Sequence, residues 1–137
     1  MPRAFRRRQR GLTLLEIMIV LAILAVVMGL IIGPSVIERF REAKIRTTKL
    51  KVDKYAFEAF PAWSVAHVDK PCPEELADLS RYANADDVRD AWGKRLAMRC
   101  GPLAPPEARG FGVASAGEDG RDDTADDIRS WQVVSGE

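Results

Sequence analysis

Six carboxylates crowd into the ten residues from Glu118 to Asp127, opposed by the single cation Arg121. They are Glu118, Asp119, Asp122, Asp123, Asp126 and Asp127. Such a density of like charge repels itself unless a cation or water screens it. Calcium takes about six to eight oxygen ligands, which a glycine-containing loop can supply from carboxylates and backbone carbonyls. The residues alone therefore allow either a calcium site or a solvated acidic loop, and their spacing does not fit an EF-hand.

The two cysteines, Cys72 and Cys100, suggest a structural bond rather than a reactive site. An even pair in an oxidising compartment forms a disulfide, which here would contribute about 3 to 4 kcal/mol through loop entropy. With the lone His67 the pair makes a poor zinc site. No orienting acid or oxyanion loop is evident for a cysteine nucleophile. We therefore predict that the protein is not an enzyme.

Glu16 is the only ionisable residue between Gly11 and Ile37. A carboxylate inside a membrane-spanning helix costs about 2.5 to 3.5 kcal/mol, so a partner must compensate it. Cleavage between Gly11 and Leu12 would create an α-amino group one helical turn before Glu16. That amine could pair with Glu16 within one helix or between staggered neighbouring helices, and Glu16 would then dock the N-terminus of the next subunit. The alternative is a shallow acid that reaches the lipid headgroups.

The run that carries Glu16 is long enough to cross the roughly 30 Å hydrocarbon core of a bilayer as a helix. It is preceded by a cluster of basic or amide residues: Arg3, Arg6, Arg7, Arg8, Gln9 and Arg10. These arginines predict a cytoplasmic N-terminus, with everything after Glu38 on the far side of the membrane. A net charge of +1, with the basic residues concentrated before Gly11, argues against binding to nucleic acid.

The helix is predicted to extend beyond the membrane, from about Leu12 to Phe60. Apolar residues between Ile37 and Ala59 recur at intervals of three and four, with charges on the other faces. Pro61 is expected to end the helix. At Gly33-Pro34 we expect a kink or local melting, because proline removes one backbone hydrogen bond.

The remainder of the chain predicts short elements. The stretch Pro71 to Glu75 is typical of a helix start, with Leu76, Leu79 and Tyr82 following on one face. Strict alternation predicts three strands, at residues 95–100, 111–115 and 128–134. We therefore predict an α+β fold in which a small antiparallel sheet of about three strands packs on the long helix. The domains would be residues 1–11 as a leader, 12–60 as the helix and 61–137 as a globular domain.

The N-terminal motif resembles the type III signal of type IV pilins and of the pseudopilins of type II secretion. It reads Arg10-Gly11-Leu12-Thr13-Leu14-Leu15-Glu16-Ile17-Met18-Ile19-Val20-Leu21. The resemblance implies that a prepilin peptidase in the membrane cleaves after Gly11 and methylates Leu12, where the family usually has phenylalanine. An ordinary secretory signal is cut beyond its apolar run. Here the cut would precede that run, and the anchor would stay with the mature protein.

Three motifs in the C-terminal half resemble the G-type subunit, the major pseudopilin. They are Asp90-Ala91-Trp92-Gly93, then Ser115-Ala116-Gly117-Glu118-Asp119-Gly120, and then Asp126-Asp127-Ile128 before Trp131. The resemblance covers about residues 8–60 and 90–131. It implies a pilin-like fold and a calcium ion in the acidic loop, held by Asp119, Asp126 and Asp127, with Asp122 as a further candidate.

The same resemblance implies a structural subunit that polymerises through its N-terminal helix into a periplasmic helical filament and drives protein export across the outer membrane. The expected location is the inner membrane, spanned once, with a periplasmic C-terminal domain. The expected partners are further copies of the chain, minor pseudopilins, the inner-membrane secretion platform and the peptidase. The alternative function is a type IV pilin or minor pilin in adhesion, motility or DNA uptake. The acidic loop and the Asp-x-Trp-Gly element favour secretion.

Overall fold

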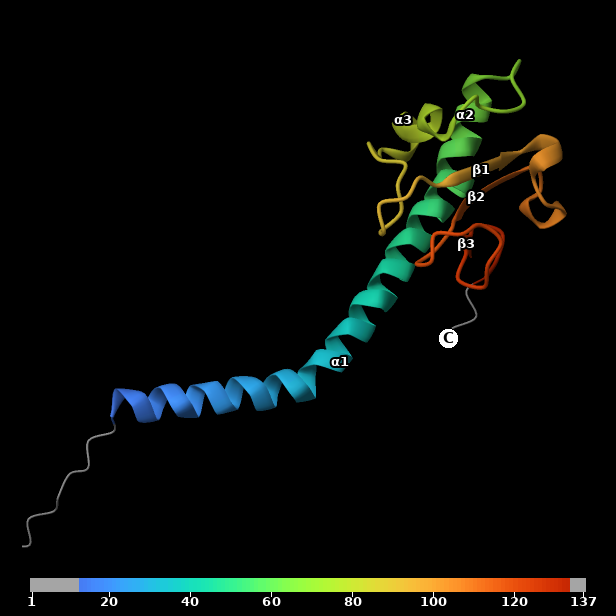
Figure 1. The fold of residues 1–137 in the computed structure, drawn as a ribbon. Helices are drawn as coiled ribbons and strands as arrows, with labels where there is room; N and C mark the ends of the chain where they lie inside the picture. The colour runs from blue at the N-terminus through green and yellow to red at the C-terminus, as the bar shows by residue number, and fades with distance from the viewer. Residues whose placement is uncertain (1–12, 134–137) are drawn as a thin grey trace, which may run out of the picture. The chain divides into compact units, whose positions relative to one another are not determined.

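A computed structural model describes residues 13–133 and has the predicted α+β class (Figure 1). The chain divides into two compact units, Met1–Phe40 and Arg41–Glu137, and each is described by itself. Helix α1 (Leu14–Lys54) contributes to both units. The sheet and the shorter helices all belong to the second unit.

The first unit contains the apolar half of α1. Thr13 precedes the helix, and its Oγ1 accepts the N–H of Glu16 at 3.3 Å, as a capping hydroxyl does. Large apolar side chains from Leu14 to Ile32 are exposed along this half. Among the described residues, this is the one helix whose length and composition suit it to cross a membrane. Such a surface requires lipid or other helices around it, because the exposure of apolar side chains to water is unfavourable.

The helix continues through Gly33 and Pro34, so the local melting that the sequence allows does not occur in the chain by itself. Proline removes a single N–H from the ladder of hydrogen bonds. The loss of one hydrogen bond at Pro34 is small beside the many others in this helix of 41 residues, so α1 stays formed on both sides of it.

Pro61 does not end the helix, contrary to the sequence expectation. A π-helical turn, η1 (Tyr55–Ala59), leads directly into α2 (Phe60–Ala66). The N–H of Phe60 bonds to the carbonyl of Tyr55, one residue further back than in an α-helix. Pro61 therefore lies just after the π-helical turn, inside one helical segment that continues to Ala66.

Three antiparallel strands form the sheet in the order β1-β2-β3: β1 (Ala97–Cys100), β2 (Phe111–Ser115) and β3 (Ile128–Arg129). Strand β2 has the predicted bounds. Strand β1 starts later than predicted, because Arg95 pairs with Arg89 across a tight turn instead of joining the sheet. Strand β3 is shorter than predicted within the described residues, because the Ser130 hydroxyl accepts the Val113 N–H where a backbone carbonyl would continue the ladder.

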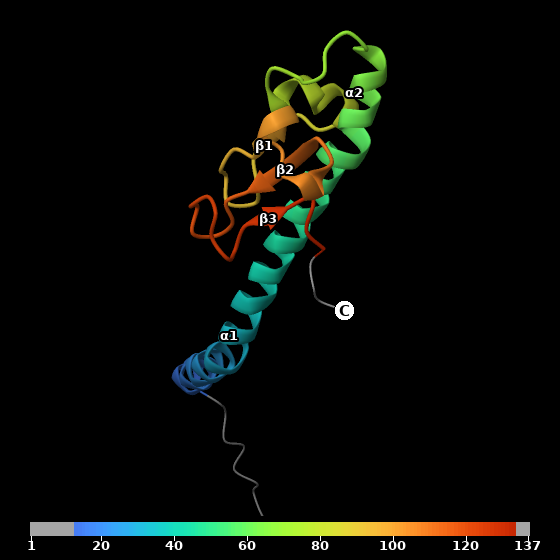
Figure 2. The ribbon, with the colours of Figure 1, turned by 90° about the vertical axis from the view of Figure 1, so that its right-hand side faces the viewer.

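The core lies between η1, α2 and the inner face of the sheet. Val52, Tyr55 and Val113 are fully buried, and the Phe60 ring stacks on Phe111 with centroids 3.9 Å apart. Figure 2 shows the sheet lying alongside this part of the helical segment. Every residue of this core lies in the unit Arg41–Glu137, so that unit holds a complete core of its own.

The predicted helix at Pro71 starts later, at Leu76. It consists of the 3-10 turn η2 (Leu76–Leu79) followed by α3 (Ser80–Ala83). The N–H groups of Glu74 and Glu75 both bond to Asp78 Oδ2, which fixes the start beyond both glutamates. Leu76 and Leu79 are buried on the predicted face.

The predicted disulfide joins Cys72 to Cys100 at the end of β1. It ties the segment before η2 to the sheet. Two further 3-10 turns, η3 (Gly101–Leu103) and η4 (Pro106–Ala108), connect β1 to β2.

Candidate functional site

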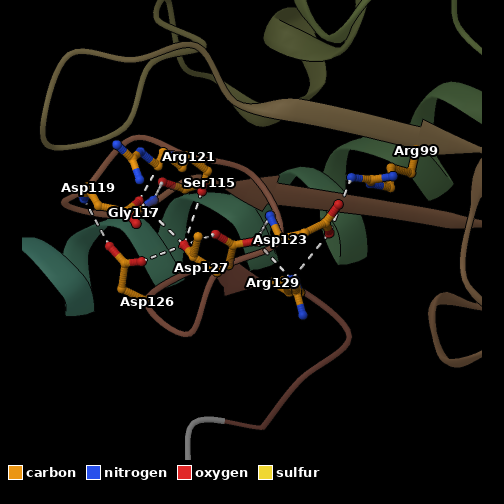
Figure 3. Close-up of polar contacts among 10 residues, drawn as sticks. Arg99, Ser115, Gly117, Asp119, Arg121, Asp123, Asp126, Asp127 and Arg129 are labelled. Carbon is orange, nitrogen blue, oxygen red and sulfur yellow. Dashed lines mark hydrogen bonds and ion pairs between the residues drawn. The ribbon is translucent and has the colours of Figure 1, made fainter.

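The acidic loop, residues 117–127, joins β2 to β3 (Figure 3). Ser115 at the end of β2 pairs directly with Ile128 at the start of β3. The two ends of the loop are therefore held together by the sheet, and the carboxylates between them are confined to a short excursion from it.

Asp90 anchors the near end of this loop from inside the protein. It is 6% exposed, and its Oδ1 accepts the N–H groups of Trp92 at 3.0 Å and Lys94 at 2.9 Å. Its Oδ2 accepts the Ser115 hydroxyl at 2.7 Å, and the Ser115 oxygen in turn accepts the N–H of Gly117. The Asp-x-Trp-Gly and Ser-x-Gly motifs are thus two parts of one hydrogen-bond network.

Gly117 begins the loop in a conformation that favours glycine, with φ of +63°. A Cβ at this position would collide with the carbonyl and carboxylate oxygens of Asp126. The near end of the loop therefore packs directly against its far end.

We expect Asp90→Ala to lower the free energy of unfolding by about 2 to 4 kcal/mol, because two backbone N–H groups and the Ser115 hydroxyl lose a buried acceptor. Urea unfolding of a soluble fragment with residues 36–137 measures this. Asp86→Ala, an exposed aspartate nearby, should change stability by less than about 0.5 kcal/mol. Equal effects of the two substitutions would contradict a structural role for the Asp90 network.

Within the loop, backbone groups and side chains bind the carboxylates individually. Asp126 Oδ1 accepts the Thr124 hydroxyl at 2.6 Å, and its Oδ2 accepts the N–H of Asp119 at 2.9 Å. The Thr124 hydroxyl, followed by the Asp119 N–H, lowers the pKa of Asp126 below its usual value. These two hydrogen bonds stabilise the negatively charged form of the Asp126 carboxyl group.

Thr124 lies at the centre of the three carboxylates. Its Oγ1 is 2.6 Å from Asp126, 3.2 Å from Asp127 and 3.4 Å from Asp119, in each case to an Oδ1 atom. The carbonyl oxygen of Arg121 is 3.1 Å away. One hydroxyl hydrogen can serve only one or two of these four oxygens. The arrangement brings several oxygen atoms together, and few of them can receive a hydrogen bond. Calcium prefers oxygen ligands of this kind.

The loop matches calcium in the type of ligand atom, but its side chains are not arranged as a metal site. Within residues 13–133, no three His, Cys, Asp or Glu side chains are arranged as a metal-binding group. Of the four aspartates that the sequence nominates, Asp119, Asp126 and Asp127 converge on Thr124. Asp122 is exposed and does not join them. Nothing in the sequence pattern pointed to Thr124.

Four basic side chains from outside the loop contact it, and the longest contact joins Arg99 Nη2 to Asp123 Oδ1 at 3.9 Å. Arg129 Nη2 is 2.8 Å from Asp127 Oδ2, and Arg41 Nε is 2.8 Å from Glu118 Oε2. Lys94 Nζ donates to the carbonyl of Gly120 at 2.8 Å. Along the sequence only Arg121 stands among the six acids, and these partners could not be predicted from it because they come from α1, β1, β3 and the turn before β1.

The groups considered for catalysis have packing roles. Both cysteines are in the disulfide, so neither can act as a thiolate nucleophile in this state. His67 stacks on Trp63 with ring centroids 4.7 Å apart, and its Nδ1 lies 3.0 Å from the Trp63 carbonyl oxygen.

The proposed processing and assembly residues lie at the N-terminus. Gly11 and Leu12 are outside the described residues. Glu16 lies in the first turn of α1 and is exposed. No side-chain partner for its carboxylate occurs within residues 13–133.

Comparison with known proteins finds matches to the N-terminal segment and to nearly the whole chain. The family model described as "Prokaryotic N-terminal methylation motif" matches residues 6–32. The chain is 32% identical over 144 residues to the type II secretion system core protein G of Dickeya chrysanthemi, with 95% of this chain and 91% of the relative covered. It is 30% identical over 144 residues to the protein of the same name from Pseudomonas aeruginosa, with 92% and 97% covered. No solved structure matches the chain significantly.

Proposed function

The chain belongs to the type II secretion system core protein G family, and we propose that it is a structural subunit of a secretion pseudopilus. The observation that carries this proposal is similarity over nearly the whole chain, in which the methylation motif coincides with an exposed apolar helix. The subunit polymerises through that helix into a periplasmic filament. Growth of the filament drives folded proteins across the outer membrane.

The exposed half of α1 explains how one segment serves two states. In the inner membrane its apolar side chains contact lipid, with the N-terminus in the cytoplasm and the domain after Glu38 in the periplasm. In a filament the same side chains contact the helices of other copies. The exchange of lipid for neighbouring helices leaves little apolar surface in water in either state, so it is driven by packing and polar pairing.

Glu16 supplies the polar pairing in this scheme. After a prepilin peptidase cuts behind Gly11 and methylates Leu12, the new amine of one subunit meets the Glu16 carboxylate of another. Minor pseudopilins and an inner-membrane secretion platform are the further partners of the filament.

Deletion of the encoding gene tests the function directly. The expected result is that folded exoproteins accumulate in the periplasm, and that the wild-type gene restores their secretion. Normal secretion together with loss of surface filaments, twitching or DNA uptake would instead identify a type IV pilin, the alternative function.

We also propose that the acidic loop binds one calcium ion through Asp119, Asp126 and Asp127. The support is the convergence of these carboxylates on Thr124. A bound divalent ion would supply the positive charge that six acids in one short loop require. It would thereby tie the start of β3 to the end of β2.

Calcium should raise the melting temperature of the fragment with residues 36–137 relative to chelator, because it binds only the folded loop. The gain in stability should reach about 2.7 kcal/mol at a free calcium concentration about 100-fold above Kd and grow with its logarithm. Magnesium should substitute poorly, because it prefers a smaller octahedral site.

Asp126→Ala should abolish the difference in melting temperature between calcium and chelator, whereas Asp122→Ala should keep it. Both substitutions remove one negative charge from the loop, but only Asp126 lies against Thr124. Identical melting curves in calcium and chelator, with no heat of binding in calorimetry, would show that the loop is only solvated.

A further inference from the structure

We propose that the turn at the end of α2, residues 67–70, docks into a groove on a second copy of this chain. This inference rests on the proposed function, because it names a contact between subunits of the filament. The groove lies in the unit Arg41–Glu137, between η1 and the segment that leads into β2. Turn and groove are different surfaces of one subunit, so the contact can repeat from copy to copy.

The turn projects one apolar side chain (Figure 1). The N–H of Lys70 bonds to the carbonyl of His67 at 3.0 Å, which closes the turn, and Val68 within it is 91% exposed. The base of the turn is held to the domain, because the His67 ring stacks on Trp63, which is buried. An apolar side chain on a rigid base loses little conformational entropy when a partner covers it.

The groove has a volume of about 670 Å³ and an aromatic lining. Phe57 of η1 lines it and is 65% exposed, together with Phe60, which stacks on Phe111. Trp131 and Val133 line it as well, and Val133 is 92% exposed. Apolar surface of this kind is better covered by an apolar side chain than by water, and the exposed valine of the turn supplies one.

The charges of the turn and of the groove are complementary. Asp69 and Lys70 lie in the turn. Glu107 and Arg109 line the groove. All four residues are exposed, and within residues 13–133 only Lys70 among them forms an ion pair, with Glu74 at 3.5 Å. A turn seated in the groove can pair each of its charges with an opposite charge, which fixes the register of the contact.

The turn is held away from the groove of its own copy. The helical segment from Phe57 to Ala66 is about 14 Å long, at a rise of about 1.5 Å per residue. The turn begins beyond this segment, so it can reach only the groove of another copy. Each added copy brings a free turn and a free groove, and contacts between two different surfaces build open helical filaments.

The contact requires a step along the helix. Two copies inserted side by side to the same depth hold their turns level with each other. The turn of one copy then lies about 14 Å beyond Phe57 of the other, by the same rise per residue. One copy must move along the helix by about this length before the two surfaces meet. The contact therefore belongs to the filament, and subunits that rest in the membrane do not make it.

Chemical cross-linking tests this contact in the full chain. Chains with Val68→Cys and chains with Glu107→Cys are expressed together and treated with a short bis-maleimide, which does not react with the disulfide Cys72–Cys100. Sheared filaments should contain cross-linked dimers only when both variants are present. Their fraction should be at least about tenfold higher than with Leu103→Cys in place of Val68→Cys, because proximity accelerates the second reaction. Leu103 is the matched control, since it is 75% exposed and does not line the groove.

Charge reversal tests the same contact without cysteines. Lys70→Glu should lower the filament yield about fivefold by placing two acids together, and Glu107→Lys should do the same by placing two bases together. Both reversals in one chain should restore the yield, which a defect in folding would not allow. A double variant that assembles no better than the single variants would overturn the charge pairing.

The other outcomes decide the docking itself. Normal filaments without this cross-link would overturn it and leave the proposed function intact. A cross-link with Val68→Cys alone would show a contact between two turns, and a cross-link to a protein of another mass would show a different partner; either result would overturn it. An equal cross-linked fraction in a Glu16→Ala background that lacks filaments would overturn the step along the helix. If the wild-type chain forms no filaments, the proposed function fails and the docking fails with it.

Discussion

Gly11→Val should leave the chain in the inner membrane as a full-length precursor without N-methylation. The peptidase that the methylation motif implies must accept a small residue immediately before the cut, and the branched side chain of valine would obstruct that position. No α-amine would then form on Leu12. The six preceding basic or amide residues would remain attached to the helix.

Intact-mass spectrometry measures both cleavage and methylation in this variant. Gly29→Val is the matched control, because it makes the same change in the same apolar run, where an added Cβ meets no atom within 4 Å. That control should be cleaved normally. Loss of protein secretion should accompany the block in Gly11→Val, and normal processing of this variant would refute the assigned signal.

Glu16→Ala should still be inserted and cleaved, but it should almost vanish from filaments. Removal of the carboxylate eliminates an insertion cost of about 2.5 to 3.5 kcal/mol, so membrane insertion should become easier. In a filament the same change leaves the α-amine of the adjacent subunit buried without its partner. Breaking a buried pair in this way costs about 3 to 5 kcal/mol, which corresponds to more than about a hundredfold at each interface.

Filament yield after shearing, compared with the amount of cleaved subunit in the membrane, measures this defect. Glu16→Gln should fail in the same way, because it keeps the size of the side chain and loses the charge. Glu38→Ala, at an exposed glutamate of α1 beyond the apolar run, should assemble normally. A normal filament yield from Glu16→Ala would show that its carboxylate is incidental to assembly.

The sequence by itself determined the features that depend on local pattern. The apolar run of α1 follows from its length and lack of charge, strand β2 and the apolar face of η2 follow from periodicity, and the structure confirms all three. The disulfide followed from a count of two cysteines in a segment expected outside the cytoplasm. These predictions succeed because hydrophobic spacing and residue type act over a few neighbouring residues, without reference to the rest of the fold.

The positions where elements end were decided by tertiary structure. Proline usually stops a helix, but the helical segment continues past Pro61 after the π-turn η1, which packs in the core through Tyr55 and Ala59. Strand β3 stops because the Ser130 hydroxyl replaces a backbone acceptor opposite Val113. Sequence rules cannot anticipate either event, because each depends on a partner distant along the chain.

The organisation of the acidic loop likewise required three dimensions. Charge density and motif position nominate four aspartates, and only folding separates Asp122 from the three that meet at Thr124. Asp90 and Arg129 reach the loop through hydrogen bonds and ion pairs that close over the sheet. Electrostatic interactions act through space, so a list of charges along the chain identifies an acidic loop, and the tertiary fold decides which cation each acid meets.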